Sequence, residues 1–281
     1  MNAVTPRHEE SITVRRIDLE VGEHTPTFWF DDNQYLTALL NGLAITFPPG
    51  ERFFIRSVQY FLKDIDDPEL RARVRAFTGQ EAMHTKEHLT FNRFLDARGF
   101  PAKGIEDFVT ERIGQIAEES TPAANLARTA ALEHFTAILG MALLEHPEVL
   151  ERMDPAVAEL WAWHAIEEIE HRSVAFDVYK EAVDDEELRL RMMRITTVIF
   201  LFANLVRMRI LVKRSGRPFE PRKALDAAKT LFGKRGLLRG IVARYRAYYR
   251  SDFHPAQHDA RELLARAKAR YLDEAAQPKA A

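Results

Sequence analysis

The chain contains no cysteine, and among its 281 residues there are only 12 glycines and 13 prolines. Without cysteine, the protein cannot form disulfide bonds, iron–sulfur clusters, thiolate-bound zinc sites or cysteine nucleophiles. The low glycine and proline content, with long stretches rich in alanine, leucine, arginine and glutamate, favours a mostly helical protein. Any metal ion in this protein must therefore be bound by carboxylate and imidazole groups.

Several sequence patterns of common enzyme and membrane classes are also missing. There is no Gly-x-Ser-x-Gly elbow, no phosphate-binding glycine loop and no dinucleotide fingerprint. No apolar run lies near the N-terminus, so we expect no secretory signal and a cytoplasmic setting. The longest apolar run, residues 195–206, is interrupted by Thr196, Thr197 and Asn204. It is too short to cross a bilayer, and we expect it to form a buried helix.

Two Glu-x-x-His elements are the most informative feature that is present. They are Glu81-Ala-Met-His84 and Glu168-Ile-Glu-His171. Positions i and i+3 lie on one face of a helix, so each pair can bind a metal ion from a single helix. One such pair alone is weak support for a metal site, because glutamate is common on helix surfaces and histidine often packs in cores.

A lone glutamate precedes each pair at a similar distance. Glu51 lies 30 residues before Glu81, and Glu133 lies 35 residues before Glu168. This separation is long enough for the chain to finish one helix, turn, and return along a second helix to the same level of the bundle. Dinuclear sites in four-helix bundles take one Glu from each of two helices and a Glu-x-x-His pair from each of the other two. The joint pattern predicts such a site.

Two further histidines fall on the same helical stripes as the predicted ligands. His88 follows His84 by four residues, and His164 precedes Glu168 by four residues. We regard both as candidate catalytic residues, as an extra ligand or a proton relay, with buried core histidines as the equal alternative. His164 is the better candidate because Trp161 shares its face. We expect four other residues off this stripe to be solvated or to lie behind the ligands: Glu87, His134, Glu167 and Glu170.

The helical periodicity predicts an all-α fold, a ferritin-like four-helix bundle with additional C-terminal helices. We expect four parts: an N-terminal arm with extended structure (1–32), the metal-binding bundle (33–183), a C-terminal helical extension packed on it (184–273) and a tail (274–281). A Pro-Pro-Gly sequence interrupts the first helix, so Glu51 is expected in the first turn of a new one. The last bundle helix is expected to run from about Pro155 to about Val183.

The segment 47–54 (FPPGERFF), followed by the two Glu-x-x-His elements and His88, resembles a bacterial family catalogued as predicted metal-dependent hydrolases. The resemblance covers roughly residues 29–240. A more remote resemblance is to the ferritin-like di-iron carboxylate superfamily of oxygenases, desaturases, oxidases and ferritins. The sequence departs from that pattern at one position: Glu51 directly follows the Pro-Pro-Gly break and is not deep within a continuous helix. The resemblance implies these ligands for two metal ions: Glu51, Glu81, His84, Glu133, Glu168 and His171.

The two resemblances imply different reactions. Four carboxylates with two histidines suit two iron or manganese ions, with zinc as a further option. This ligand set on a helical bundle is typical of iron and dioxygen chemistry, so we favour a di-iron oxidoreductase acting on a small hydrophobic substrate. Its electrons would come from a separate reductase or from the substrate itself. The alternatives are a hydrolase that uses a metal-activated water molecule, or a non-catalytic metal-binding protein.

The C-terminal third is strongly basic, whereas the whole chain has a net charge of −2. Residues 207–270 contain 18 Lys and Arg against 5 Asp and Glu. This region could bind an anionic membrane surface, an acidic carrier protein or an acyl substrate with a charged head, which would make the protein peripheral to the membrane. The alternative is a basic cap that neutralises the acidic bundle. No nucleic-acid-binding motif is present, and no nucleic acid is expected as a partner.

Overall fold

The computed structural model describes residues 11–273, and this part of the chain is all-α apart from one isolated bridge between Phe30 and Met153. The predicted tail, 274–281, lies outside the described residues. The α-helices are α1 (Gln34–Ala44), α2 (Phe47–Tyr60), α3 (Pro68–Ala97), α4 (Ala102–Glu119), α5 (Pro122–Glu145), α6 (Pro147–Leu150), α7 (Pro155–His171), α8 (Val174–Ala182), α9 (Glu186–Arg214), α10 (Pro221–Phe232), α11 (Ile241–Ala247) and α12 (Arg261–Lys268). Short single turns lie at Leu62–Asp64, Pro255–Gln257 and Ala269–Asp273.

Three of the long helices start with the same local signal. Asp67, Thr121 and Asp154 each accept a hydrogen bond from a backbone N–H group in the first turn of α3, α5 and α7. A proline follows each of them directly, where its missing N–H group costs no helical hydrogen bond. Gly99, with a φ of 86°, follows the end of α3. The sequence thus determines where these helices begin.

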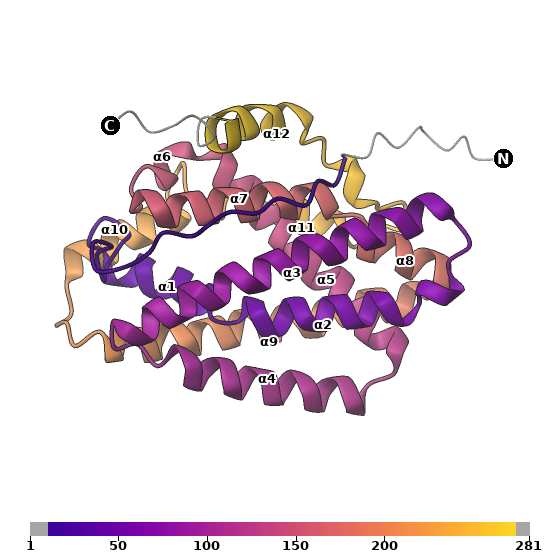
Figure 1. Ribbon diagram of the computed structural model, residues 1–281, viewed down its shortest axis with the longest axis horizontal. Helices are drawn as coiled ribbons and strands as arrows, with labels where there is room; N and C mark the ends of the chain where they lie inside the picture. The colour runs from indigo at the N-terminus through magenta and orange to yellow at the C-terminus, as the bar shows by residue number, and fades with distance from the viewer. Residues whose placement is uncertain (1–10, 274–281) are drawn as a thin grey trace.

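Four helices enclose the centre of the molecule (Figure 1). α2 packs against α3 and α5, and α7 packs against the same two helices. α5 and α7 approach closely at Gly140, where an added Cβ atom would lie 3.1 Å from the Ala165 carbonyl oxygen. Side chains that point inward from these four helices therefore meet at a shared interior.

The N-terminal arm is extended, but it pairs with no strand in the part of the chain that the structure describes. From residue 11 it crosses the face of α3 and α7 (Figure 1). Its backbone bonds to side chains instead: Thr13 N–H donates to Glu170 at 3.4 Å, and Arg15 N–H donates to Glu167 at 3.2 Å. The arm thus lies directly over the helix that carries Glu168.

Two helix boundaries differ from the prediction. α2 begins at Phe47 and includes the Pro-Pro-Gly sequence, so Glu51 lies inside a helix, because prolines are tolerated in a first turn. The helix expected to continue to about Val183 ends at His171 and restarts as α8. At this break the guanidinium of Arg172 donates to the Ile169 carbonyl. In a continuous helix that carbonyl would accept a hydrogen bond from the backbone N–H group four residues later.

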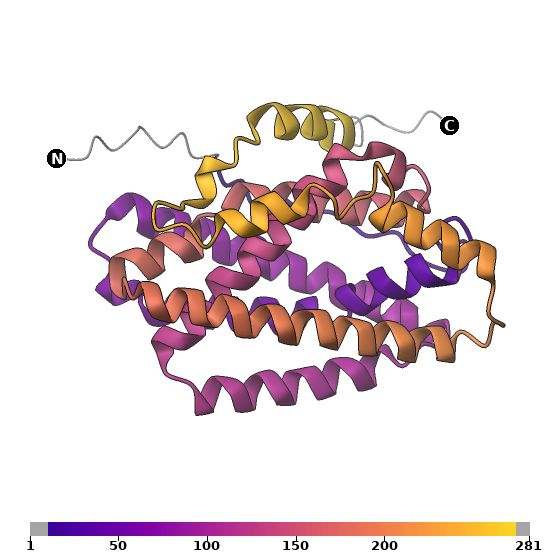
Figure 2. The ribbon, with the colours of Figure 1, turned by 180° about the vertical axis from the view of Figure 1, so that it is seen from behind.

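The prediction of a buried helix for residues 195–206 was wrong. This run forms the middle of α9, which lies on the outside of the molecule, where Val198 and Phe202 are each 68% exposed (Figure 2). α9 packs mainly against α1 and α5, and α11 contacts it where the Thr197 hydroxyl lies 3.0 Å from the Tyr245 hydroxyl, while Val198, Phe202 and Leu205 stay exposed. Farther along the chain, α11 packs on α5 and α12 packs on α7. The division into arm, bundle and extension stays a prediction.

Candidate metal centre

All six predicted ligands lie in the interior that the four helices enclose. Glu51 comes from α2, Glu81 and His84 come from α3, and Glu133 comes from α5. α7 supplies the other two, Glu168 and His171. Each of the six side chains is buried, with at most 2% of its surface exposed. All six side chains thus enter one shared interior, and their role as metal ligands stays a prediction.

One group of donor atoms surrounds the ring of His171. Its Nε2 atom lies 3.2 Å from Glu81 Oε1, 3.3 Å from Glu133 Oε2 and 3.5 Å from Glu168 Oε2. A metal ion with bonds of about 2.1 Å sets neighbouring ligand atoms about 3.0–3.4 Å apart. The three oxygens thus lie from Nε2 at about the separation of two donors on one cation, and the donor atoms of Glu81, Glu168 and His171 all lie within 4.8 Å of one another.

A second group surrounds the ring of His84. Its Nδ1 atom lies 3.4 Å from Glu168 Oε1 and 3.8 Å from Glu81 Oε2. Glu51 joins Glu81 and His84 in a cluster whose donor atoms all lie within 4.8 Å of one another. Glu81 and Glu168 thus present one oxygen to each group, as bridging carboxylates between two metal ions would.

These donors lack other partners. Both carboxylate oxygens of Glu81 and Glu133, together with Glu51 Oε1, Glu168 Oε2 and His171 Nε2, are buried and make no hydrogen bond. Buried polar atoms without a partner are costly, and in native proteins they are rare. Carboxylate and imidazole groups are ligands for iron, manganese and zinc. The residues present therefore fit a pair of metal ions.

Polar groups behind the two histidine ligands orient their rings. The Nδ1–H group of His171 donates to Gln80 Oε1 at 2.9 Å, and the amide of Gln80 donates to Glu170 Oε2 at 2.8 Å. His84 Nε2 lies 3.2 Å from Glu167 Oε2. A hydrogen-bond acceptor behind a metal-binding histidine fixes its tautomer and leaves the other nitrogen free for the metal. We assign His171 Nε2 and His84 Nδ1 as the metal-facing atoms.

A single arginine from the arm binds both of these outer carboxylates. Arg15 donates to Glu170 Oε1 and Oε2 at 2.8 Å each, and to Glu167 Oε1 at 3.2 Å. Lys268 reaches Glu170 at 2.6 Å. The sequence reasoning missed Arg15, since nothing in an extended arm signals a distant contact. For Glu167 and Glu170 the sequence left two alternatives, solvated or behind the ligands; both side chains are buried behind the predicted ligands.

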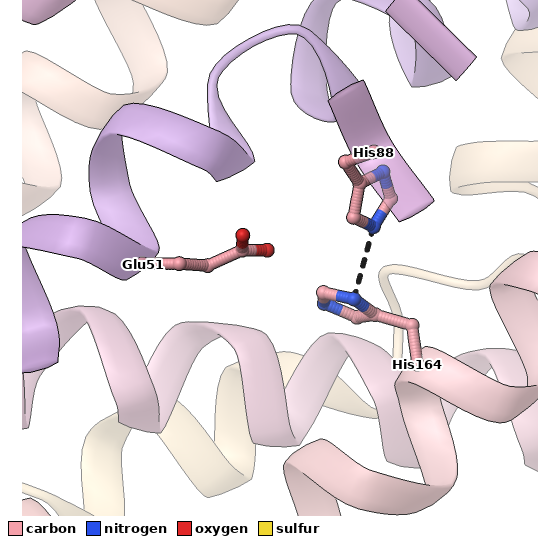
Figure 3. A group of neighbouring side chains, drawn as sticks. All are labelled: Glu51, His88 and His164. Atoms are coloured by element: carbon pink, nitrogen blue, oxygen red, sulfur yellow. Dashed lines mark hydrogen bonds between the residues drawn. The ribbon is translucent and has the colours of Figure 1, made fainter. Parts of the chain in front are cut away.

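His164 and His88 extend the cluster beyond the second group (Figure 3). His164 Nε2 lies 3.2 Å from Glu168 Oε1, and its Nδ1 atom is 3.0 Å from His88 Nε2. Figure 3 shows the carboxylate of Glu51 directed toward both rings. Phe47 stacks on the His164 ring with centroids 4.6 Å apart. His164 therefore offers a seventh donor, and His88 lies behind it.

The remaining two residues that were expected off the stripe lie elsewhere. Glu87 is buried and is bound by Lys86 at 2.7 Å. His134 follows Glu133 in the sequence but points the other way: its Nε2 atom lies 3.1 Å from the carbonyl oxygen of Arg244. Neither of them belongs to the clusters of potential metal ligands among residues 11–273.

Burial and mutual charge shift the pKa values of this cluster strongly. Burial lowers the pKa of His171, but the carboxylates of Glu168 and Glu133 outweigh it and hold the pKa well above its ordinary value. Burial raises the pKa of Glu133 to about 8. Burial and the nearby His84 lower the pKa of His164 to about 3. In the metal-free protein, protonated rings thus offset part of the carboxylate charge, and bound cations would replace those protons.

The comparisons with known proteins point to a metal-dependent enzyme family. A family profile described as "Predicted metal-dependent hydrolase" matches residues 13–259, most of the chain. No curated protein and no solved structure shows a significant match to the chain. The matched range includes Arg15, all six predicted ligands and both further histidines. The chain therefore belongs to the family of predicted metal-dependent hydrolases.

Proposed function

We propose that this protein is a metal-dependent hydrolase with a dinuclear centre inside a ferritin-like four-helix bundle formed by α2, α3, α5 and α7. The family description supports hydrolysis. The observation that carries the metal centre is the buried set of carboxylate and imidazole atoms that face one another without hydrogen bonds. Such a set is stable only with cations or protons between its members.

The two metal positions would share the carboxylates of Glu81 and Glu168. Glu133 and His171 would complete the first position, and Glu51 with His84 would complete the second. His164 Nε2 lies 3.2 Å from the carboxylate of Glu168, so it would stand beside the second position, free to accept a proton there. Two iron or two manganese ions suit this oxygen-rich set, and zinc is a further choice.

The chemistry of the bound ions would be hydrolytic. Two metal ions at these positions would lower the pKa of a water molecule to about 7 and polarise a scissile carbonyl or phosphoryl group. Burial and neighbouring histidines lower the pKa values of His88 and His164, so both rings are neutral at neutral pH. Their hydrogen bond lets one proton pass between His164 Nδ1 and His88 Nε2. We assign this pair as the proton relay beside the second position.

A small hydrophobic substrate fits the surroundings of the second position. Phe47 stacks on His164, and Trp161 lies 5.8 Å from the Phe47 ring, measured between ring centroids. His88 contacts the same two aromatic rings. An aromatic wall next to a metal position would bind the apolar part of a substrate and keep water out.

Oxidation by dioxygen, which the sequence analysis favoured, is the second candidate; the family description supports hydrolysis instead, and only the type of donor groups speaks for oxidation. Four carboxylates with histidines from Glu-x-x-His pairs are the ligands of di-iron bundle proteins. This reading needs electrons from a separate reductase or from the substrate. Hydrolysis needs neither electrons nor oxygen, so one condition separates the two candidates.

The test is hydrolysis of aryl esters, anilides and aryl phosphoesters under anaerobic conditions, with the full chain loaded with iron, manganese or zinc. We expect turnover that a chelator abolishes and that His171→Ala reduces at least about 100-fold, since one metal position then loses a ligand. Glu111→Ala, on the exposed surface of α4, is the matched control. Turnover that appears only with oxygen and a chemical reductant would instead support oxidation and contradict the hydrolase proposal.

A further inference from the structure

α9 runs along the outside of the molecule (Figure 2), and its outer face carries a band of exposed apolar side chains. The three most exposed members of this band are Val198, Phe202 and Leu205, which are 68%, 68% and 65% exposed. The same band includes Ile195, Ile199, Leu201, Val206 and Ile210, each at least 38% exposed. Soluble monomers rarely expose large contiguous apolar patches, and those that do occur commonly mark an interaction surface.

Toward its two ends α9 buries apolar side chains, Leu188, Met192, Met193 and Leu211, but its middle differs from an ordinary surface helix. Over its middle, the side chains turned toward the protein include the polar Thr196 and Asn204, both buried. The large aliphatic and aromatic side chains point outward, whereas a surface helix normally buries its apolar face. This arrangement is stable only if another apolar medium covers the outer face.

After the two glutamates in the first turn of α9, the charged residues of the helix and of the segment that follows it are all basic up to Phe219. Between Leu188 and Phe219 the sequence contains no acidic residue and eight basic ones: Arg189, Arg191, Arg194, Arg207, Arg209, Lys213, Arg214 and Arg217. Exposed arginines precede the apolar band at 191 and 194, and exposed basic residues follow it at 209, 213 and 214. Lysine and arginine side chains at the edges of an apolar helix face are attracted to anionic lipid head groups.

A surface hollow lies at the basic end of this band. It measures about 400 Å³ and is lined by Tyr35 from α1 and by Leu205, Met208, Arg209, Val212 and Lys213 from α9. Basic groups beside an apolar lining match the boundary between a charged lipid head group and its acyl chains. The hollow thus extends the same chemistry from the helix face toward α1.

We propose that α9 is the membrane-docking surface of this protein and that it binds the plane of an anionic lipid bilayer. α9 is the one helix among residues 11–273 that is long and apolar enough to cross a membrane. It packs against α1 and α5 along its length, however, and at Gly42 the α1 backbone approaches the Cβ atom of Arg207 closely. Crossing the bilayer would break these contacts, whereas lying in the interface keeps them and covers the exposed face.

The test is sedimentation of the full chain with phosphatidylcholine vesicles that contain or lack phosphatidylserine. The wild-type protein should bind the phosphatidylserine vesicles and should be released progressively by salt. The triple variant Val198→Ser, Phe202→Ser, Leu205→Ser should bind on the order of 100-fold more weakly, because three side chains no longer insert. Tyr60→Ser is the control, since Tyr60 is 55% exposed on α2 and lies outside the apolar band of α9.

A second pair of variants tests the charge contribution. Reversing Arg209, Lys213 and Arg214 to Glu should abolish the preference for phosphatidylserine. The control reverses three exposed arginines on α2 and α3 to Glu: Arg56, Arg75 and Arg93. This control changes the net charge equally and should keep the preference for phosphatidylserine. All substituted side chains are exposed, so circular dichroism and the unfolding temperature should stay close to those of the wild type.

Two results would overturn the proposal. One is a wild-type protein that stays in the supernatant with both kinds of vesicle. The other is a stable dimer in size-exclusion chromatography that the triple serine variant converts to monomer, because a second copy of the chain would then cover the α9 face.

Discussion

Arg15 offers the sharpest test of how the metal centre is held, because it reaches the centre from outside the four helices. Its guanidinium binds Glu167 and Glu170, whose side chains are fully buried, and Glu167 lies 3.2 Å from the Nε2 atom of His84. Replacing Arg15 with Met keeps the aliphatic stem and removes the charge. Glu167 then loses the guanidinium that holds it in place, so it orients the ring of His84 less firmly.

The expected size follows from these contacts. Removing a group that supports a metal ligand typically lowers metal affinity about 10–100-fold. The effect should fall mainly on one of the two ions, because Lys268 still pairs with Glu170 at 2.6 Å, whereas Glu167 has lost its cation. Removing one member of a buried ion pair is destabilising. Since the Arg15 side chain is 21% exposed, we expect a loss of about 2 kcal/mol in the free energy of unfolding.

The assay is a metal titration against a competing chelator, combined with urea unfolding of the metal-free protein. Arg15→Lys keeps the charge but loses the two-pronged geometry, so its affinity should be intermediate. Arg16→Met is the matched control, because Arg16 is the exposed neighbour. The reasoning is refuted if Arg15→Met binds both ions as tightly as the wild type, or if both methionine variants weaken binding equally.

Three further predictions concern the ligands, the helix packing and the protons. Glu168→Ala and His84→Ala should strip or halve the metal content while circular dichroism stays unchanged, and Glu111→Ala should keep all of it; full metal in both ligand variants would contradict the assignment. Gly140→Val should lower the free energy of unfolding by about 1–3 kcal/mol in urea titrations, because its side chain meets the α7 backbone, and an unchanged value would show that the two helices can separate freely. Facing carboxylates hold the pKa values of His84 and His171 well above the ordinary value, so these rings carry protons at neutral pH in the metal-free protein. Metal binding should therefore release protons, measured with an indicator dye, and affinity should rise with pH; binding without proton release would be inconsistent with this account.

The residues that meet in the candidate site could be predicted from the sequence because local geometry determines most of their placement. The i and i+3 spacing places Glu81 with His84, and Glu168 with His171, on one helix face each. The helical hairpins then place each lone glutamate at the same level of the bundle as its Glu-x-x-His pair, as the structure shows for Glu133 and His171. Local signals at Asp67, Thr121 and Asp154 also mark three helix starts, so the all-α fold and the centre of the site follow from short-range rules.

The remaining features depend on contacts between distant parts of the chain. Arg15 is about 150 residues from Glu167 and Glu170, in a segment without helical periodicity, so no local rule connects them. The exposure of α9 was missed for a related reason. Hydropathy reports how apolar a segment is, and an apolar helix can face a protein core or a lipid surface. Only the positions of the neighbouring helices distinguish the two.

The most direct test of the central claim is the metal-to-protein ratio of the full chain. The protein would be produced with iron, manganese and zinc supplied together, purified without chelator and analysed by mass spectrometry of the elements. The account predicts about two bound ions per chain. It also predicts that changing Glu81 and Glu168 together to Ala removes both ions, because these carboxylates face both groups of donors. A wild-type protein without bound metal, or a double variant that retains two ions, would contradict the account.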